Sequence, residues 1–211
     1  MRSPAVAISE PFDVARPEGY FKALACVIER MPLPLIDDIV ALLLRAFDDQ
    51  RTVFVYGNGG SAALACHCAC DMGKGTATEK RQRLRIVSLT GNAALMTAWA
   101  NDCGYDRIFV EQLRNLLQPG DISFAISGSG NSPNVLKALQ FSREIGAVNV
   151  GLTGFQGGRM RSLCDLCLVV PSDNMQLIED MHVSVSHAVF SAVRQHLANS
   201  FGSKTAAVAA D

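Results

Sequence analysis

The sequence predicts an α/β protein built on a doubly wound, parallel, five-stranded sheet flanked by helices. Short β-branched runs alternate with helical stretches, the runs are apolar on both faces, and most of them end in glycine or serine. Two further helical segments precede the first strand, so an N-terminal helical extension is expected.

The chain opens with a proline-rich stretch that predicts a flexible N-terminal arm over residues 1–19. From residue 20 to residue 49 apolar side chains recur at helical spacing, and the MPLP segment at residues 31–34 divides them into two helices. This pair caps the domain or buries its apolar face against another subunit. Residues 20–211 are expected to form a single domain that includes the helix pair.

Strands are expected at residues 52–57, 83–90, 121–127, 147–154 and 166–171. The helical stretches after the first three strands read GNGGSAALACHCACDM, NAALMTAWAND and GNSPNVLKALQFSREIG. A long helix over residues 175–196 closes the domain.

Composition argues against several classes of protein. The 211 residues are 49% apolar and 18% charged, with a net charge of −1, which is typical of a globular domain without the basic footprint of a nucleic-acid binder. Charged residues interrupt every apolar stretch, and the N-terminus has no apolar segment typical of a signal peptide. We therefore expect a cytoplasmic protein that binds neither membrane nor nucleic acid directly.

Seven cysteines, an odd number, fit a reducing compartment better than a disulfide framework. Cys164 and Cys167 form a single CxxC in a run that leads into an apolar strand, where cysteine serves as a small core residue. Three more cysteines, at positions 66, 68 and 70, flank His67. A cysteine-based zinc or redox protein is the weaker alternative interpretation.

Two loops carry the features of an anion site, because ligands of such sheets bind at the carboxyl ends of the strands. Glycine lets backbone N–H groups approach an anion, and serine hydroxyls and a following helix N-terminus add donors. Neither loop contains lysine or fits a nucleotide-binding motif, so no nucleotide cofactor is expected. The hydroxyls of the second loop predict a phosphate cradle formed by Ser127, Ser129 and Ser132, just before Pro133. The first loop is expected to bind substrate through Asn58, Gly59, Gly60 and Ser61.

Two helices each offer a carboxylate and an imidazole. His67 and Asp71 are four residues apart and share a helix face, whereas Glu179 and His187 are eight apart, a little over two turns. His182 is five residues from His187 and is therefore left out of the predicted site. His67, Asp71, Glu179 and His187 make a competent ligand set for zinc or another divalent metal.

The segments GNGGSAALACH, WANDCGYDRIF, PGDISFAISGSGNSPNVLKAL, GLTGFQGG and IEDMHVSVSH resemble the sugar isomerase (SIS) domain, and within it the sedoheptulose-7-phosphate isomerase group. The resemblance covers residues 20–196 and implies a flavodoxin-like sheet, a homotetramer and active sites at subunit interfaces. It also implies phosphate contacts for Ser61, Ser127, Ser129 and Ser132, and an active-site position for Asp102.

In the resembling isomerases the four helix positions are His, Glu, Gln and His, and in some members they bind zinc. The glutamate and the second histidine form the proton-transfer pair. Here Asp71 stands in place of the glutamate and Glu179 in place of the glutamine. Asp71 reaches one methylene less far, and the set as a whole is more anionic.

Our leading hypothesis is an aldose–ketose isomerase acting on a phosphorylated sugar through an enediol, as in heptose-phosphate synthesis for lipopolysaccharide or related glycans. Asp71 or Glu179 acts as the base, and His187 carries the oxygen proton. The alternative is a non-catalytic, sugar-phosphate-binding regulatory protein of the same fold, such as one that associates with a replication initiator. In that relative the last histidine is typically lost, whereas His187 is present here.

Overall fold

Five parallel strands form the centre of the molecule in the computed structural model, which describes residues 12–77 and 82–208, with side chains up to residue 199. The strands lie in the order β2-β1-β3-β4-β5, and every neighbouring pair is parallel. The predicted fold class is therefore confirmed. The strands are β1 (Thr52–Gly57), β2 (Arg85–Ser88), β3 (Ile122–Ile126), β4 (Val148–Thr153) and β5 (Leu166–Val169).

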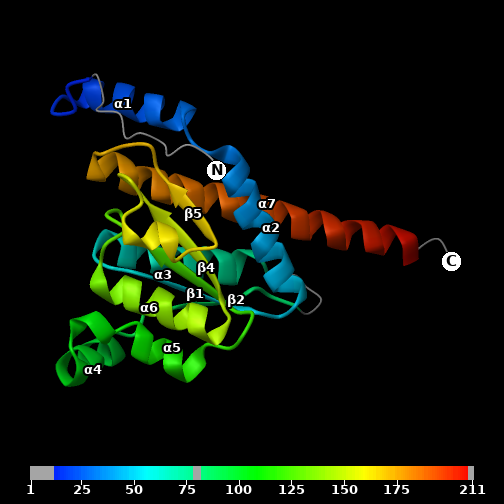
Figure 1. The fold of residues 1–211 in the computed structure, drawn as a ribbon. Helices are drawn as coiled ribbons and strands as arrows, with labels where there is room; N and C mark the ends of the chain where they lie inside the picture. The colour runs from blue at the N-terminus through cyan, green and yellow to red at the C-terminus, as the bar shows by residue number, and fades with distance from the viewer. Residues whose placement is uncertain (1–11, 78–81, 209–211) are drawn as a thin grey trace.

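Helices cover both faces of this sheet (Figure 1). One layer consists of α1 (Pro17–Glu29), α2 (Leu33–Asp48), α3 (Gly60–Gly75) and α7 (Met175–Val208). The other layer consists of α4 (Ala93–Cys103), α5 (Val110–Leu116) and α6 (Pro133–Ile145), with the 3₁₀ segments η1 (Tyr105–Arg107) and η2 (Arg159–Ser162).

The period of a β-strand decides which side chains enter which layer. In β1, Val53 and Val55 join the core under α2, α3 and α7, while Phe54 and Tyr56 join the core under α5 and α6. All four side chains are buried, which explains the unbroken apolar character of this strand. The Tyr56 hydroxyl meets the Ser123 hydroxyl at 2.7 Å inside the second core.

The two glycine-rich loops meet at the switch point of the sheet. After β1 the chain crosses to β2 through α3 on one face, and after β3 it crosses to β4 through α6 on the other face. Strands β1 and β3 are hydrogen-bonded neighbours whose pairing ends at Gly57 and Ile126. Both loops therefore leave adjacent strand ends and diverge around a crevice, which is the usual ligand position in such a sheet.

Several boundaries differ from the prediction. Helix α1 begins at Pro17, inside the predicted arm, and Phe12 and Val14 pack against the core, while residues 1–11 lie outside the described residues. Strand β2 is shorter than predicted and only partly buried, because it is an edge strand rather than a central one. Helix α7 continues to Val208, beyond the sheet (Figure 1), and α5 was not predicted.

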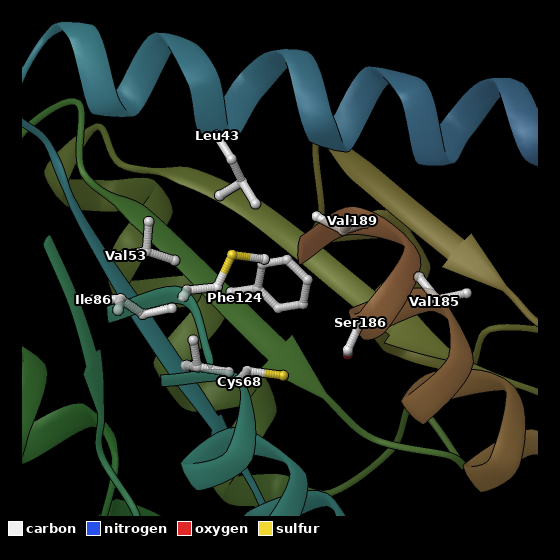
Figure 2. Close-up of a pocket in the computed structure, with 10 residues that line it drawn as sticks. Leu43, Val53, Cys68, Ile86, Phe124, Val185, Ser186 and Val189 are labelled. Atoms are coloured by element: carbon white, nitrogen blue, oxygen red, sulfur yellow. The ribbon is translucent and has the colours of Figure 1, made fainter. Parts of the chain in front are cut away.

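A small gap remains in the larger core, between α2, α3, α7 and the sheet (Figure 2). It holds about 20 Å³ of space for the centre of a water molecule, and its walls are almost wholly apolar, so it favours no ordered water. Cys68 lines it beside Ser186, and burial raises the pKa of the Cys68 thiol. This cysteine is a packing residue. The gap is lined by Leu43, Val53, Val55, Cys68, Met72, Ile86, Phe124, Val185, Ser186 and Val189.

Within the described part of the chain, no helix combines the length and the apolar character needed to cross a membrane.

Replacing Leu43 by alanine enlarges this gap, and we expect the free energy of unfolding to fall by about 2–5 kcal/mol. Leu116→Ala is the matched leucine control, since Leu116 is 46% exposed and Leu43 only 2%. Chemical denaturation at fixed protein concentration measures both variants. Equal losses for the two leucines would contradict the packing described here.

Candidate active site

Helices α3 and α7 pack side by side and bring two histidines and one carboxylate to one point. The Nε2 atoms of His67 and His187 are 2.8 Å apart. The Oδ2 atom of Asp71 lies 3.3 Å from the first of them and 3.8 Å from the second. The helical spacing of four places His67 and Asp71 on one face of α3, as predicted, and α7 supplies the third group from 116 or more residues away.

This cluster fits a divalent metal ion. Ligand atoms 2.0–2.2 Å from a shared tetrahedral ion lie about 3.4 Å from one another, close to the three separations observed here. Two imidazoles and one carboxylate are a usual donor set for zinc. Among the described residues, His67, Asp71 and His187 form the group with suitable ligand geometry.

The structure does not bring Glu179 to this point. Glu179 and His187 lie on the same helix, and eight residues correspond to about 12 Å along its axis. The Glu179 carboxylate instead faces the first turn of α3. A Cβ atom added to Gly60 would lie 3.3 Å from each of its oxygens. The predicted four-ligand set is thus reduced to three within one chain.

The first loop is fixed by an amide pair that sequence reasoning missed. Asn58 Nδ2 donates to Asn134 Oδ1 at 2.9 Å, and Asn134 Nδ2 donates back to Asn58 Oδ1 at 2.8 Å. The Tyr105 hydroxyl donates to the same Asn58 oxygen at 2.9 Å. Asn134 is buried in the first turn of α6, so this pair ties the loop after β1 to the helix after β3.

The serine loop presents hydroxyls at the N-terminus of α6, which begins at Pro133 as the sequence indicated. Ser127 Oγ and Ser132 Oγ are 3.2 Å apart, and Ser129 Oγ accepts a hydrogen bond from the backbone of Asn131. Ser132 occupies the N-cap position without a side-chain cap bond to the helix. The positive end of α6 therefore remains available to an anion.

Backbone bonds on the far side of this loop hold it in place. Gly128 O accepts from Gly154 N at 2.9 Å, and Gly130 O accepts from Met160 N at 2.9 Å. Because these carbonyls are engaged away from the crevice, the loop offers hydroxyls and N–H groups rather than carbonyl oxygens to a ligand.

The remaining residues of the predicted site, Gly59, Ser61 and Asp102, lie on α3 and α4 or at their ends. Gly59 takes a positive φ of 54° at the N-cap of α3, and the buried Ser61 follows in its first turn. Asp102 is exposed near the end of α4, where it accepts a hydrogen bond from Asn101. No described contact joins Asp102 to the histidine cluster.

His182, which was left out of the predicted site, lines a cavity of about 240 Å³ together with Ser61 and Glu179. Its side chain is almost fully buried, and neither ring nitrogen has a hydrogen-bond partner of good geometry among the described residues. Burial lowers the pKa of His182 to about 4, and the backbone of Thr153 offsets part of this effect. His182 is therefore neutral at pH 7.

Both the sequence and the fold of this chain match known proteins. Residues 19–154 match the SIS domain family. The chain is 43% identical to the phosphoheptose isomerase of Pelobacter propionicus over 83% of its own length and 93% of that protein. It is 38% identical to the phosphoheptose isomerase of Aliarcobacter butzleri over 84% and 93% of the two lengths.

Solved structures of phosphoheptose isomerases share the fold of this chain. The phosphoheptose isomerase of Neisseria gonorrhoeae superimposes with a TM-score of 0.80 at 29% identity, covering 86% of this chain and 98% of that one. The enzyme of Francisella tularensis superimposes with a TM-score of 0.78 at 26% identity, covering 87% and 98% of the two chains.

Because His182 is buried, we expect the free energy of unfolding to fall in acid. Its pKa is about 4 in the folded chain and about 6.5 when exposed, so between these values the unfolded chain binds a proton that the folded chain does not. Above pH 6.5 this difference in pKa does not reduce the free energy of unfolding. As the pH drops from 6.5 to 4, the free energy of unfolding falls by about 3 kcal/mol.

His182→Gln removes the titrating group, so its free energy of unfolding should fall less between pH 7 and pH 4.5 than that of the unchanged chain. Denaturation at several pH values compares the two. Parallel pH profiles would contradict the assignment of a neutral, buried imidazole.

Proposed function

The chain belongs to the SIS domain family and, within it, to the phosphoheptose isomerases, and on that premise we propose that it interconverts sedoheptulose 7-phosphate and the corresponding aldose phosphate. The observation that carries the proposal is the convergence of His67, Asp71 and His187 from two helices. A proton-transfer set of this kind is what an aldose–ketose isomerisation requires.

The phosphate of the substrate would lie in the serine loop. Ser127, Ser129 and Ser132 supply hydroxyl donors, and the uncapped N-terminus of α6 supplies a favourable dipole. Asn58 and Ser61 border the same crevice from the loop after β1 and would contact the sugar. Binding at this loop fixes the register of the carbon chain relative to the acid–base groups.

The isomerisation moves one proton between adjacent carbons and another between their oxygens. We assign the carbon proton to Asp71, since its carboxylate lies at the histidine cluster whereas that of Glu179 does not. Asp71 would take the proton from the carbon beside the carbonyl, leaving an enediol, and return it to the neighbouring carbon. His187 would give a proton to the carbonyl oxygen and receive the one released by the adjacent hydroxyl.

A zinc ion held by His67, Asp71 and His187 is part of the proposal. When bound, such an ion would occupy the lone pair of His187 Nε2, and it would itself polarise the carbonyl and stabilise negative charge on its oxygen, in place of the proton that His187 supplies in the metal-free site. The separations of the three ligand atoms support this assignment.

We also propose a homotetramer in the cytoplasm, as in the group that the sequence resembles. Three large apolar side chains on α1 and α2 support self-association, since Phe21, Ile28 and Leu33 are exposed in the single chain. The seven cysteines are free thiols, which suits a reducing compartment. Sedimentation or light scattering of the full chain tests the number of subunits.

Ser129→Ala should weaken binding of sedoheptulose 7-phosphate by about 10-fold or more, because a hydrogen bond to a charged group contributes about 1.5–3 kcal/mol. Calorimetry measures the affinity, and Ser191→Ala on the exposed surface of α7 serves as the control. Unchanged affinity in the Ser129 variant would refute the phosphate assignment.

His187→Ala should lower turnover by about 100-fold or more, since it removes a general acid–base group, while substrate affinity stays close to that of the unchanged chain. The same variant should lose bound zinc, measured by metal analysis. His196→Ala, further along α7, is the matched control and should keep both. Turnover at the normal rate in the His187 variant would overturn the proposed mechanism.

A further inference from the structure

Two thiols share one space beside β4, on the face of the sheet that carries α6. Cys167 stands opposite Gly151 in the pairing of β5 with β4, and Cys164 precedes β5. A Cβ atom at Gly151 would lie 2.8 Å from Cys164 Sγ and 3.5 Å from Cys167 Sγ. Because Gly151 has no side chain, both sulfur atoms lie close to the space that its Cβ atom would occupy.

The two thiols also influence each other's titration. Their interaction raises the pKa of Cys164 and lowers the pKa of Cys167. The positive charge of Arg161 lowers the pKa of Cys167 further. One sulfur is thus favoured as the thiolate while its neighbour keeps the proton, which is the arrangement from which thiol–disulfide exchange proceeds.

No other cysteine pair in the described residues has this arrangement. Cys66 and Cys70 share a face of α3 at a spacing of four, but Cβ atoms at that spacing are about 5–6 Å apart, beyond the reach of a disulfide. Cys66 Sγ instead contacts the hydroxyls of Ser88 and Thr90 at 3.4 and 3.3 Å. Cys68 faces the apolar gap shown in Figure 2.

We propose that Cys164 and Cys167 form a reversible dithiol–disulfide site, which takes a low-molecular-weight disulfide as its oxidant. The Cys167 thiolate attacks one sulfur of the small disulfide, forms a mixed disulfide and releases the first small thiol. Cys164 then gives up its proton and attacks the Cys167 sulfur, which closes the intramolecular bond and releases the second small thiol. Two protein thiols are oxidised and one small disulfide is reduced to two thiols.

The site lies apart from the residues assigned to catalysis. It adjoins η2, whose backbone supports the serine loop through Met160 N, but neither cysteine faces the histidine cluster or the loop hydroxyls in any described contact. Serine variants of the two cysteines should therefore keep their isomerase activity under reducing conditions. Failure of the redox proposal is for this reason separable from failure of the proposed function.

The test uses the full chain equilibrated in mixtures of reduced and oxidised glutathione, followed by acid quenching, alkylation and peptide mapping. We expect a Cys164–Cys167 disulfide that dithiothreitol reverses. The exposed Cys66, Cys70 and Cys103 should carry glutathione at most as mixed disulfides. Cys164 and Cys167 that stay alkylatable as free thiols while these exposed thiols are modified would overturn the proposal.

Variants identify the attacking sulfur. In Cys164→Ser the mixed disulfide with glutathione should accumulate on Cys167, because the resolving thiol is gone. In Cys167→Ser, modification of Cys164 should be at least about 10-fold slower, since burial and the charge of Asp165 still raise the pKa of Cys164 when Cys167 is gone. Cys103→Ser is the control and should leave the disulfide unchanged. Equal rates in the two single variants would contradict the assigned roles, and the unchanged chain decides the main question if a variant fails to fold.

Discussion

The site depends on the close approach of backbones at the carboxyl edge of the sheet. Gly130 adopts a positive φ of 63°, and a Cβ atom there would lie 2.2 Å from the carbonyl oxygen of Gly157. Gly158 is similarly close: its φ is 53°, and a Cβ atom there would lie 2.6 Å from the carbonyl oxygens of both Ser129 and Gly130. Only glycine allows the loops after β3 and β4 to meet in this way, and their backbone bonds to one another leave the serine hydroxyls facing the crevice. The position of the proposed phosphate cradle follows from this packing.

Much of the fold is readable from the sequence because local pattern and burial agree there. Residues 52–56 are β-branched or aromatic and buried on both faces, and β1 has the predicted bounds, 52–57. The pattern is less informative where burial is uneven. Strand β2 lies at the sheet edge, and its residues are alternately exposed and partly buried. The sequence pattern therefore predicted a longer strand, residues 83–90, than the observed Arg85–Ser88. Helix α5 has only seven residues, too few for a helical period to stand out.

Only the parts of the candidate site that lie on one helix could be predicted from the spacing of residues in the sequence. A spacing of four placed His67 and Asp71 together, but spacing along α7 gave no information about which turn of α3 each residue would face. The spacing of five residues from His187 excluded His182 from the predicted site. Its spacing of three from Glu179 was the useful signal, since residues three apart share a face, and both line the same cavity. The Asn58–Asn134 pair joins segments 76 residues apart and has no local signature.

The two helix N-termini at the crevice differ in charge, and this difference supports the proposed orientation of the substrate. At α3 the carboxylate of Glu179 faces Gly60, so the positive end of that helix is already matched by an anion. At α6 the N-cap residue Ser132 makes no side-chain bond to the helix, and the hydroxyl oxygens of Ser127 and Ser132 lie 3.2 Å apart. A phosphate would be repelled by the carboxylate at α3 and stabilised at α6. This difference supports the proposal that the phosphate end of the sugar lies at the serine loop and its hydroxyl-bearing end at α3 and α7, beside the proposed acid–base groups.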